Sequence, residues 1–585
     1  MQPDEVQFVH FNDVVSALQR PSFSILSNMQ LTIQYHIPSA AHLASFLYIQ
    51  RDFASSNPRA QTLTLFSGDA FSPSLEASVL KGEQICPILD HVRISVASLG
   101  NHDFDFGNAR LIELCNTLKF PWVLSNAYHL PDGKANEGAR RFLGTAQEYV
   151  VKQLENGLRI GFLGLAGTDW PSNCEDLPPC EIQSPVEVAR RIARHLRVHE
   201  RCDVVIGLTH MRLPEDLAVA AATASGESRI DLLLGGHDHE VLRRFKGDTD
   251  LISEHIEQGQ HIADVEKNGM VPDIEGDNIR LAKSGTDWRA MSLIRLIVHR
   301  DEHGAAVKST VTLRQYTDIK AAMGEPASPP AHLVQTIERI HERVGGLVQK
   351  PLLHTATPLD GRNFTIRRQE TNLGNMLADA IRAFYGVGIG FFNSGAIRID
   401  QVLDATIPDG NPLLVRDMFN ICPFGNALLV KEVSGEILRL ALENAICDMH
   451  TDGRFLQISG MRMVACWKQP QGSRVLDVLI ERPDGGFEPL DLEQKYSVAM
   501  PSFIAHGYDG FTWFATAETL VGDEAAMTDS SLLLTMFGND GEVSHGIHAL
   551  NIERARAVTV VGRSPEDSLP IVKPVVDDRI RFVEV

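Results

Sequence analysis

Six residues that can bind metal ions follow short apolar runs in the first half of the chain. They supply carboxylates, imidazoles and one amide: Asp13, Asp69, Asn101, His210, His237 and His239. This mixture of hard and borderline ligands suits Zn, Mn or Fe, and one carboxylate can bridge two ions about 3.5 to 4 Å apart. The residue types therefore predict a centre of two divalent metal ions.

The densest polar stretch is Ser98–Gly107, which overlaps the end of the apolar run Ile94–Leu99. It places an amide, an imidazole and two carboxylates within five residues: Asn101, His102, Asp103 and Asp105. Polar groups at a buried strand end are costly unless they are partnered. The stretch therefore indicates chemistry rather than an ordinary turn.

Each of the proposed ligands also has a structural alternative. Asp13 and Asp69 are typical of turns or helix caps, and His210 is compatible with a core histidine bonded to the backbone. His237 and His239 are two residues apart, so on an extended segment their side chains would project to the same side. These structural alternatives would need a separate explanation for the metal-binding residue at each strand end, whereas one metal centre explains all of them. The set as a whole therefore favours the metal centre.

The elements that must position these residues alternate in type, as in an α/β layer structure. Strands are predicted at six apolar runs: Val6–Phe11, Thr62–Phe66, Ile94–Leu99, Ile160–Leu165, Val204–Leu208 and Ile230–Leu234. Amphipathic spacing predicts helices at Ala40–Arg51, Asn108–Leu118 and Pro185–His199. Ligands in such folds gather beyond the carboxyl ends of the strands, where five of these runs place the candidate residues.

The later part of the chain divides at the Pro-rich segment 323–330. Before it, Glu240–Asp287 loses periodicity and is expected to form loops with short strands, followed by closing strands at Ser292–Val298 and Ser309–Leu313. After it, a connecting helix is predicted at Ala331–Val348. The second domain is expected to contain a helix at Asn372–Phe384 and strands at Ala427–Val433, Ser473–Ile480 and Tyr496–Met500.

Composition narrows the class of protein. The 585 residues are 44% hydrophobic and 22% charged, with a net charge of −21, so an extended surface for a nucleic acid polymer or an anionic membrane is not expected. No run approaches the roughly 18 apolar residues of a membrane span. The acidic start lacks the pattern of a signal peptide, so a cytoplasmic location is expected, or a secreted or periplasmic one if a signal has been removed.

Several motifs resemble one known family. Asn12-Asp13, Gly68-Asp69, Gly100-Asn101-His102-Asp103, Thr209-His210 and Gly236-His237-Asp238-His239 resemble the ordered signature of the calcineurin-like metallophosphoesterases. The 5'-nucleotidase and UDP-sugar hydrolase branch is indicated by Asn101–Gly107, by Phe120-Pro121-Trp122 with Ser125-Asn126, and by Lys283–Asp287. Further motifs are similar to the C-terminal domain of that branch: Glu370–Asn375, Asn393–Arg398, Pro423–Asn426 and Gly507–Phe511.

The resemblance covers about Val6 to Phe514 and implies the domain organisation. A layered metallophosphoesterase sandwich of mixed sheets flanked by helices would occupy residues 1–322, and a linker with a connecting helix residues 323–348. A separate α+β nucleotide-recognition domain would occupy 349–540, with an extension of unknown role at 541–585. A hinge in the connecting helix would have to set the distance between phosphate and nucleoside sites.

For the first domain, the resemblance implies attack of a metal-bound hydroxide on phosphorus. Asp69 would bridge the two ions, Asp13 and His239 would serve one, and Asn101, His210 and His237 the other. His102, held by Asp105, would stabilise the transferring phosphoryl group or the leaving oxygen, while Asp103 would be structural. The less favoured alternative for Asp105 is an ordinary turn carboxylate.

For the second domain, the resemblance implies a nucleotide substrate. Phe424 and Phe503 match two rings that sandwich the base, and stacking tolerates any base. The residues that match nucleoside and ribose contacts are Arg367, Asn393, Arg398 and Asp509. Taken singly, each Phe is compatible with a core residue and each Arg or Asn with a solvated surface.

Two motifs depart from the family pattern. The first motif is normally Asp-x-His, but here it is Asp13-Val14-Val15, and Val15 cannot bind a metal. The ion at Asp13 would then gain water or another residue as ligand, bind weakly, or be missing. Ser394 and Ala396 also stand in a run that is normally glycine, which could shift substrate choice.

The leading hypothesis is a metal-dependent phosphohydrolase acting on 5'-nucleotides or related nucleotide esters. A hydrolase of the same fold for nucleotide sugars or 2',3'-cyclic nucleotides is an alternative that the sequence does not separate. From a different class, the loss of a ligand at Val15 suggests a weakened, nucleotide-binding pseudo-phosphatase. The sequence does not predict an oligomeric state.

Overall fold

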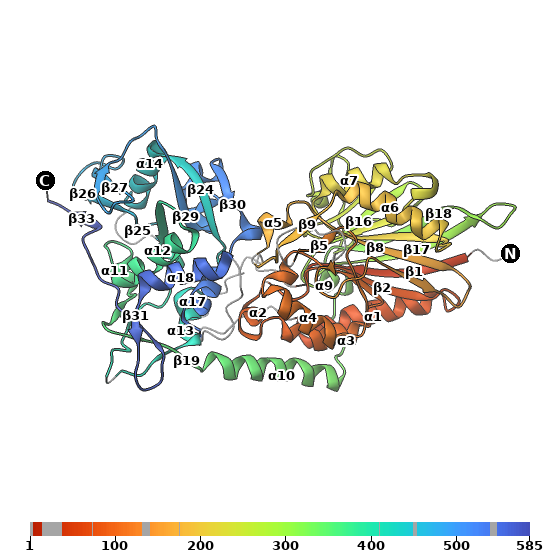
Figure 1. Ribbon diagram of the computed structural model, residues 1–585, viewed down its shortest axis with the longest axis horizontal. Coiled ribbons are helices and arrows are strands. Elements are labelled where there is room, and N and C mark those ends of the chain that lie inside the picture. The colour runs from red at the N-terminus through yellow and green to blue at the C-terminus, as the bar shows by residue number, and fades with distance from the viewer. Residues whose placement is uncertain are drawn as a thin grey trace. The chain divides into compact units, whose positions relative to one another are not determined.

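The computed structural model describes residues 4–14, 38–72, 74–130, 141–174, 176–408, 410–447, 453–538 and 547–584. These residues form two compact units, the first extending to Val344 and the second beginning at Gly345 (Figure 1). Both units mix helices with several sheets, which agrees with the α/β and α+β character predicted from the sequence.

Two sheets form the centre of the first unit. In order, the seven-stranded sheet contains β15 (Ile274–Gly276), β18 (Ala306–Tyr316), β17 (Met291–Arg300), β1 (Asp4–Phe11), β2 (Thr62–Ser67), β3 (Val96–Ser98) and β4 (Trp122–Val123). The six-stranded sheet contains β12 (Val241–Phe245), β16 (Ile279–Ser284), β11 (Leu232–Gly235), β10 (Val204–His210), β8 (Arg159–Ala166) and β7 (Tyr149–Gln153). One apolar core joins residues of both sheets, including Phe8, Phe162 and Ile206.

Helices cover the outer face of each sheet (Figure 1). One side carries α6 (Pro185–Val198) and α7 (Leu213–Ala222), which bury an apolar stripe against the six-stranded sheet. The opposite side carries α1 (Ala40–Ser56), α2 (Leu75–Leu80), α3 (Cys86–Val92) and α4 (Gly107–Thr117). Apolar residues on a single face explain these positions, because a sheet or an amphipathic helix must bury that face against another layer.

The direction of the strands determines where side chains can meet. In the first sheet β1, β2, β3 and β4 run parallel, and in the second β8, β10, β11 and β16 do so. The carboxyl ends within each parallel set therefore lie at one edge of its sheet. Residues that directly follow β1, β2, β3, β10 and β11 can converge there.

Most elements predicted from apolar periodicity are confirmed, with ends that shift by a few residues. The predicted strand Ile94–Leu99 shortens to β3 (Val96–Ser98), because the backbone turns directly into the polar stretch. The segment between Glu240 and Asp287, expected to form loops with short strands, contains short strands, and two of them, β12 and β16, belong to the six-stranded sheet. Charged residues in β12 and β16 interrupt the apolar pattern, so apolar runs alone do not give the bounds of either strand.

The first unit also contains shorter elements around its sheets. They are η1 (Glu83–Ile85), η2 (His102–Phe104), β5 (Ala127–His129), β6 (Arg141–Phe142), α5 (Trp170–Asn173), β9 (Cys180–Ile182), η3 (Gly226–Ser228), β13 (His255–Glu257), β14 (Gln260–His261), α8 (Ile262–Val265) and α9 (Ile319–Met323). The predicted connecting helix is α10 (Ala331–Val348). Near its end, Arg343 forms a two-pronged ion pair with Glu83, with N–O distances of 2.7 and 2.8 Å.

The second unit contains a five-stranded sheet of β25 (Leu456–Ser459), β21 (Ile389–Asn393), β29 (Lys495–Pro501), β24 (Leu428–Ser434) and β30 (Glu518–Val521). Helix α12 (Asn372–Tyr385) packs against β25 and β21, and α14 (Gly435–Ala445) contacts β24. The other elements before the tail are β19 (Pro351–Thr355), β20 (Leu359–Asp360), α11 (Asn363–Ile366), η4 (Ser394–Ala396), β22 (Val402–Leu403), β23 (Leu413–Leu414), α13 (Val415–Ile421), β26 (Met461–Ala465), β27 (Val475–Glu481), β28 (Phe487–Pro489), α15 (Ser502–Ala505), η5 (Tyr508–Gly510), α16 (Thr512–Ala515), η6 (Asp523–Ala525) and α17 (Asp529–Phe537).

The tail, which the sequence left without an assigned role, is part of this second unit. Helix α18 (Ile547–Thr559) packs against α12 and α17 and buries Ile552 and Ala555. It is followed by β31 (Val560–Arg563) and β32 (Pro570–Val572), and β32 pairs in parallel with β19. The last strand, β33 (Ile580–Phe582), pairs with β26. The described residues of the tail therefore complete two sheets and one apolar core.

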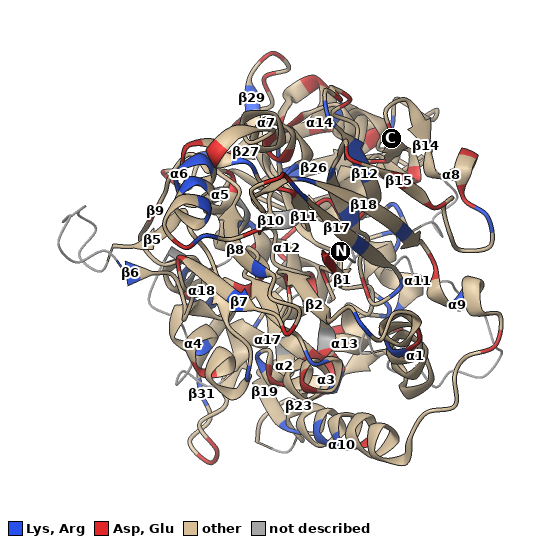
Figure 2. Ribbon diagram, turned by 90° about the vertical axis from the view of Figure 1, so that its right-hand side faces the viewer, with Lys and Arg blue, Asp and Glu red and all other residues tan. Residues whose placement is uncertain are grey.

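The most basic run of the sequence is neutralised within the fold. Helix α6 carries several arginines, visible in blue in Figure 2. Arg191 lies 2.8 Å from Glu148 and Arg194 lies 2.9 Å from Glu227, while Arg197 pairs with Asp231. These ion pairs offset the positive charge of α6 locally. Among the described residues, no helix is both long and apolar enough to cross a membrane.

Candidate metal centre and nucleotide site

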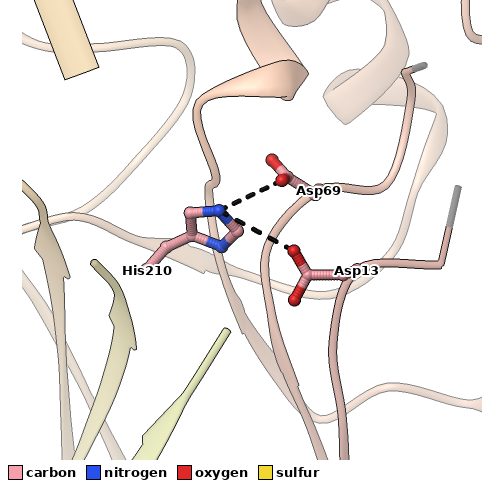
Figure 3. A group of neighbouring side chains, drawn as sticks. All are labelled: Asp13, Asp69 and His210. Atoms are coloured by element: carbon pink, nitrogen blue, oxygen red, sulfur yellow. Dashed lines mark ion pairs between the residues drawn. The ribbon is translucent and has the colours of Figure 1, made fainter. Parts of the chain in front are cut away.

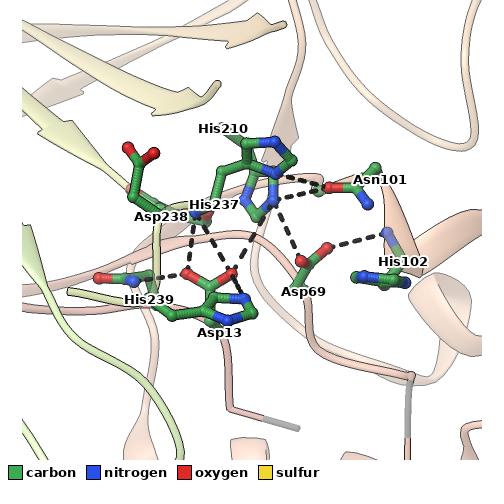
Figure 4. A network of polar contacts seen from close by, with 12 residues as sticks. Asp13, Asp69, Asn101, His102, His210, His237, Asp238 and His239 are labelled. Carbon is green, nitrogen blue, oxygen red and sulfur yellow. Dashed lines mark hydrogen bonds and ion pairs between the residues drawn. The ribbon is translucent and has the colours of Figure 1, made fainter. Parts of the chain in front are cut away.

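All six predicted metal ligands lie together at the carboxyl ends of the strands (Figure 4). Asp13 follows β1, Asp69 follows β2 and Asn101 follows β3, while His210 ends β10 and His237 and His239 follow β11. Figure 3 shows the innermost three, Asp13, Asp69 and His210, whose ligand atoms all lie within 4.8 Å of one another. Segments far apart in the sequence thus bring their polar groups to one point.

Four of the residues form one compact set of ligand atoms. The Nε2 atom of His210 lies 3.1 Å from Oδ2 of Asp69 and 3.0 Å from Oδ1 of Asn101. The Nδ1 atom of His237 lies 3.0 Å from the same Oδ1 of Asn101. Two imidazole nitrogens, an amide oxygen and a carboxylate oxygen therefore face one small volume.

The remaining two residues form a second set beside the first. The Nε2 atom of His239 lies 3.3 Å from Oδ1 of Asp13, and this oxygen is 3.9 Å from Nε2 of His210. Asp69 belongs to the close group around His210 and also accepts a hydrogen bond of 2.9 Å from the backbone N–H of His102. The arrangement is compatible with one carboxylate shared between two cation positions.

Hydrogen bonds select the ring nitrogen that each imidazole presents to the centre. Nδ1 of His210 lies 2.7 Å from the backbone oxygen of Ser67 and donates to it, which leaves Nε2 as the lone-pair atom. Nε2 of His237 lies 3.4 Å from Oδ2 of Asp169, which leaves Nδ1 facing Asn101. Supporting groups of this kind orient metal-binding histidines.

Asp169 is an acidic support that the sequence analysis missed. Burial alone would raise the pKa of its carboxyl group, but His237 and Arg212 outweigh burial and lower the pKa to about 2. Arg212 donates to Asp169 over 2.8 Å. Asp169 lies in a loop after β8 with no ligand motif around it, so only its place after an apolar run could have indicated it.

The chemistry of the donor set fits divalent metal ions. Oδ2 of Asp69 is buried and receives no well-directed hydrogen bond, although His210 lies nearby. Burial would lower the pKa of His210, but the two buried carboxylates, Asp69 and Asp13, raise it to about 9. A field that holds an imidazole in its cationic form also attracts metal cations.

Glycines bring the backbone close to these carboxylates. A Cβ atom on Gly100 would lie 2.2 Å from Oδ1 of Asp69, and one on Gly236 would lie 2.8 Å from Oδ2 of Asp13. A side chain at either position would displace a proposed ligand. Both positions therefore require glycine, because only a residue without a side chain leaves room for the carboxylates.

Four of the ligands adopt left-handed backbone conformations, with φ of 49° at Asp13, 62° at Asp69, 79° at His237 and 60° at His239. Such conformations cost on the order of 1 to 3 kcal/mol for residues other than glycine and concentrate at functional sites. The expected extended segment at His237 and His239 was therefore wrong. The two rings converge because a turn held by hydrogen bonds from His237 N–H to Asp13 aims them.

The sequence analysis also assigned no supporting role to Asn12 or to Lys283. Asn12 donates from Nδ2 to Asp13 over 2.5 Å and accepts from the N–H of Ser284 over 2.9 Å, which fixes the Asp13 carboxylate. Lys283 is fully buried, lies 2.7 Å from Asp216 and contacts Asp238, and donates to the oxygen of Gly236 over 2.8 Å. A lysine inside a fully buried strand was the available signal for this internal ion pair.

The predicted acid–base pair is formed beside the centre. Nδ1 of His102 lies 2.9 Å from Oδ2 of Asp105, and both residues are nearly buried, with 7% and 8% of their surfaces exposed. Since Nδ1 is held by the carboxylate, Nε2 is the ring atom that can exchange a proton with a bound substrate. The backbone of His102 is tied to Asp69, so the pair and the ligand group are linked.

Asp103 has the structural position expected for it. Its carboxylate accepts from four backbone N–H groups, those of Gly100, Asp69, Ala70 and Phe71, over 2.7 to 3.2 Å. Burial, followed by the neighbouring charge of Asp69, raises the pKa of Asp103 to about 7. Asp103 therefore ties the loop after β2 to the loop after β3. Val15 and Ser16, on which the ligand argument for Asp13 depended, lie outside the described residues.

The predicted nucleoside residues all lie in the second unit. Asn393 ends β21, and its buried Oδ1 receives no hydrogen bond. The guanidinium carbon of Arg398 lies 5.0 Å from the centroid of the Phe424 ring. Burial and then the neighbouring Arg367 lower the pKa of Arg398, while Asp509 opposes them, which places these three charged groups near one another.

The last member, Phe503, lies on α15 and stacks on Tyr508, with ring centroids 5.0 Å apart and planes inclined by 20°. Both rings are partly exposed, 38% for Phe503 and 44% for Tyr508. The contacts pair Phe424 with Arg398, and Phe503 with Tyr508. Tyr508 lies in a motif noted from the sequence, but its stacking role was not predicted.

Comparisons with known proteins show what the chain is similar to. Residues 350–516 match the family model of the 5'-nucleotidase, C-terminal domain. The trifunctional nucleotide phosphoesterase protein YfkN of Bacillus subtilis is 24% identical over 524 residues, covering 83% of this chain. The match spans 32% of that longer relative. Human 5'-nucleotidase is 24% identical over 525 residues, which are 87% of this chain and 84% of the human protein.

A solved structure shares the fold over nearly the whole chain. The NAD nucleotidase (NadN) of Haemophilus influenzae superimposes with a TM-score of 0.66 at 16% identity, and 99% of each chain is covered. Both the sandwich and the second unit fall within this match. The fold that the sequence motifs implied is therefore present.

Proposed function

We propose that the chain belongs to the 5'-nucleotidase family, that it is a hydrolase acting on phosphoric ester bonds, and that it releases phosphate from 5'-nucleotides or related nucleotide esters. The match to the C-terminal domain lies within the second unit, and the first unit would correspond to the calcineurin-like domain. The observation that carries the proposal is the convergence of six predicted ligands around Asp69.

We assign the ligands to two divalent ions. Asp13 and His239 would hold one ion, and Asn101, His210 and His237 the other, with Asp69 shared between them. When bound, such ions supply an activated water and neutralise charge on the phosphoryl oxygens. Zn, Mn and Fe all suit this mixture of nitrogen and oxygen ligands.

The chain's own groups perform the remaining tasks. His102 can donate a proton or a charged hydrogen bond from Nε2 to the phosphoryl group or the leaving oxygen. Asp105 fixes the tautomer of His102 through Nδ1, over 2.9 Å, and favours the charged ring. Asp169 and the Ser67 carbonyl hold His237 and His210 in place, so the ligands need little reorganisation.

Groups of the second unit would recognise the nucleoside. Phe424 and Phe503 offer aromatic faces for the base, and such stacking accepts many bases. The buried, unpaired Oδ1 of Asn393 is available to accept a hydrogen bond from a ligand. Arg367, Arg398 and Asp509 supply charge and hydrogen-bonding groups for the sugar and phosphate side.

A second candidate function follows from Val15, where the family has a ligand histidine. If the ion at Asp13 binds too weakly, the chain would bind nucleotides without turning them over. Hydrolysis of nucleotide sugars or of 2',3'-cyclic nucleotides stays within the leading proposal. Relatives named as a trifunctional phosphoesterase and as an NAD nucleotidase support considering these wider substrates.

Phosphate release separates these candidates. The purified chain is incubated with Mn²⁺, Zn²⁺ or Co²⁺ and, in separate reactions, with AMP, a nucleotide sugar and a 2',3'-cyclic nucleotide. The proposal expects turnover of at least one of them, lost in His102→Ala. Nucleotide binding without phosphate release under any of these metals would favour the pseudo-phosphatase instead. Val15→His should tighten metal binding if the site lacks only the histidine ligand at this position.

A further inference from the structure

A second pair of histidines meets on a hairpin that takes no part in the centre described above. Strands β13 and β14 pair so that His255 lies opposite His261. Their Nε2 atoms are 3.1 Å apart, and the ring centroids are 4.2 Å apart with planes inclined by 82°. Neither residue belongs to a motif that resembles the family.

The nearest ring atoms are positioned as two ligands of one ion would be. Two imidazole nitrogens about 2.0 to 2.1 Å from a tetrahedral Zn²⁺ lie about 3.3 Å from each other. The observed separation of 3.1 Å is close to that value. His261 is exposed, so water can complete the coordination of an ion on the outer side of the pair.

A carboxylate orients the inner histidine. Oδ2 of Asp250 accepts from Nδ1 of His255 over 2.5 Å, which leaves Nε2 of His255 as the lone-pair atom facing His261. Asp250 is itself fixed, because it accepts from the N–H groups of Gly259 over 2.9 Å and Ile252 over 3.1 Å. A carboxylate behind a histidine is the usual support of a metal ligand.

A buried arginine holds the loop that carries this pair. Arg244 is fully buried and donates to the backbone oxygens of Ile252, His255 and Ile256 over 2.8 to 3.1 Å. Ile256 also packs in a small apolar cluster with Val241, which lies two residues after His239. Buried contacts therefore hold the inner strand of the hairpin to the first unit.

We propose that His255 and His261 form a separate binding site for a divalent transition-metal ion, with Zn²⁺ as the best-fitting ion, oriented by Asp250. Imidazole ligands suit Zn²⁺, Cu²⁺ and Ni²⁺ rather than Mg²⁺ or Ca²⁺. Such an ion would join the two strands of the hairpin across their side chains. The site does not depend on the proposed phosphohydrolase activity.

Zinc stoichiometry tests this site apart from the main centre. Full-length chains carrying Asp69→Asn, which weakens the main centre, are dialysed against Zn²⁺, and bound zinc is measured by mass spectrometry. One zinc equivalent is expected to disappear when His261→Ala or His255→Ala is added. His303→Ala is the matched control, because His303 is an exposed histidine of the same unit with 83% of its side chain accessible, and it should keep that equivalent.

Equal zinc content with and without His261→Ala would overturn the proposal and leave the pair as a hydrogen bond between two imidazoles. Because His261 is exposed, the single variant His261→Ala should retain the phosphate release of the wild type, which verifies that it folds. A failure of the phosphohydrolase proposal would instead appear as absent turnover in the wild type with the hairpin zinc still bound. The two failures are therefore distinguishable.

Discussion

At the scale of single residues, the centre depends on which atom each side chain can offer. Ser67 and Asp169 engage one nitrogen of His210 and His237, respectively, and Asp105 engages Nδ1 of His102. In each case the opposite nitrogen is left for chemistry. His210 and His237 turn that nitrogen toward Asn101, whereas His102 stands outside the proposed ligand set.

His102→Ala is expected to lower kcat by roughly 10²- to 10⁴-fold with a much smaller change in KM, because proton transfer and charge stabilisation act in the transition state. Asp105→Asn should lower kcat less, since the ring remains but its tautomer is no longer fixed. Steady-state kinetics with the best substrate measure both. Metal content should stay at the wild-type value in both variants, and a wild-type kcat in His102→Ala would remove His102 from the mechanism.

Phe424→Ala is expected to raise KM about tenfold and to leave kcat nearly unchanged, because stacking of one base contributes about 1 to 3 kcal/mol. Phe364→Ala is the matched control. Phe364 is an exposed phenylalanine of the same unit, 76% accessible, that packs against Arg368 and has no assigned role. Substrate-saturation curves for the two variants give the KM and kcat values that test this expectation. Equal KM values would mean that Phe424 does not contact the base.

The sequence predicted the ligands better than their supports. Asp13, Asp69 and His210 could be found because each follows an apolar run and is chemically able to bind a metal. Asn12, Asp169 and Lys283 could not be assigned in the same way, since their roles depend on the backbone oxygens and carboxylates that folding brings near them. Asn393 is likewise defined by an unpaired buried oxygen that only the structure reveals.

At the scale of elements, the loops after β2 and β3 behave as one unit. Asp103 accepts from backbone N–H groups of both loops, and Gly100 lets them approach each other. The positions of Asp69 and Asn101 therefore depend on each other. Parallel strands bring the loops to one edge, but these short-range contacts set the distance between the ligands.

Gly100→Ala is expected to lose bound metal and to reduce turnover by at least about 10²-fold, because a Cβ atom would lie 2.2 Å from Oδ1 of Asp69 and displace a ligand by an ångström or so. Gly345→Ala is the matched control. Gly345 lies in α10 with nothing within 4 Å of the added atom, and the change should stabilise the helix by about 0.5 to 1 kcal/mol. Metal analysis and kinetics measure the outcome, and a wild-type metal content in Gly100→Ala would contradict it.

A second coupling joins α17 to the loop that carries Phe424. Oδ2 of Asp529 accepts from Asn426 over 3.1 Å, and the N–H of Asp529 donates to the backbone oxygen of Asn426 over 2.9 Å. Burial raises the pKa of Asp529 to about 7, although hydrogen bonds that its carboxyl group accepts from Asn426 and from the N–H of Ser530 oppose the shift. The folded chain therefore keeps a proton on Asp529 that the unfolded chain releases near pH 4.

This difference predicts a pH-dependent stability of the second unit. Since the folded state binds the extra proton between about pH 4 and pH 7, the contribution of Asp529 to stability is present at low pH and is lost as pH rises through that window. Asp529→Asn, which is neutral at every pH, should remove this dependence, a change of roughly 4 kcal/mol at most. Calorimetry of both chains across the window measures it. Stability curves that stay parallel would show that Asp529 is ionised throughout.

Elements were predictable where periodicity was strong and local. The helix Ala331–Val348 and most buried strands agree with the structure within a few residues. The strands β12 and β16 were hidden because Arg243, Arg244 and Lys283 lie within them, and their partners come from distant loops. A pattern of alternating side chains likewise does not predict the left-handed backbone conformation at His237 and His239.

At the scale of the whole molecule, the chain combines a strongly acidic total charge with sites proposed for an anionic substrate. A net charge of −21 repels polyanions at long range, so attraction of a phosphate must come from local cations. The metal ions would supply these in the first unit, while Arg367 and Arg398 would do so in the second. Small nucleotides fit this arrangement better than polymers.

The tail shows what the sequence could not predict at this scale. Its short strand β32 pairs with β19 (Pro351–Thr355), and its last strand β33 pairs with β26 (Met461–Ala465), so both partners come from much earlier in the chain. Strands of three residues have too little pattern to be recognised, and their pairing depends on the finished fold. The limits of the domains proposed from the sequence stay predictions, although both units are compact.

The central claim is that Asp69 lies between two divalent ions held by the six converging residues. Anomalous X-ray scattering from crystals grown with Mn²⁺ tests it most directly. Two peaks are expected, one within coordination distance of Asp13 and His239 and one beside Asn101, His210 and His237, both adjoining the Asp69 carboxylate. The absence of any peak beside Asp69 at saturating Mn²⁺ would contradict the account.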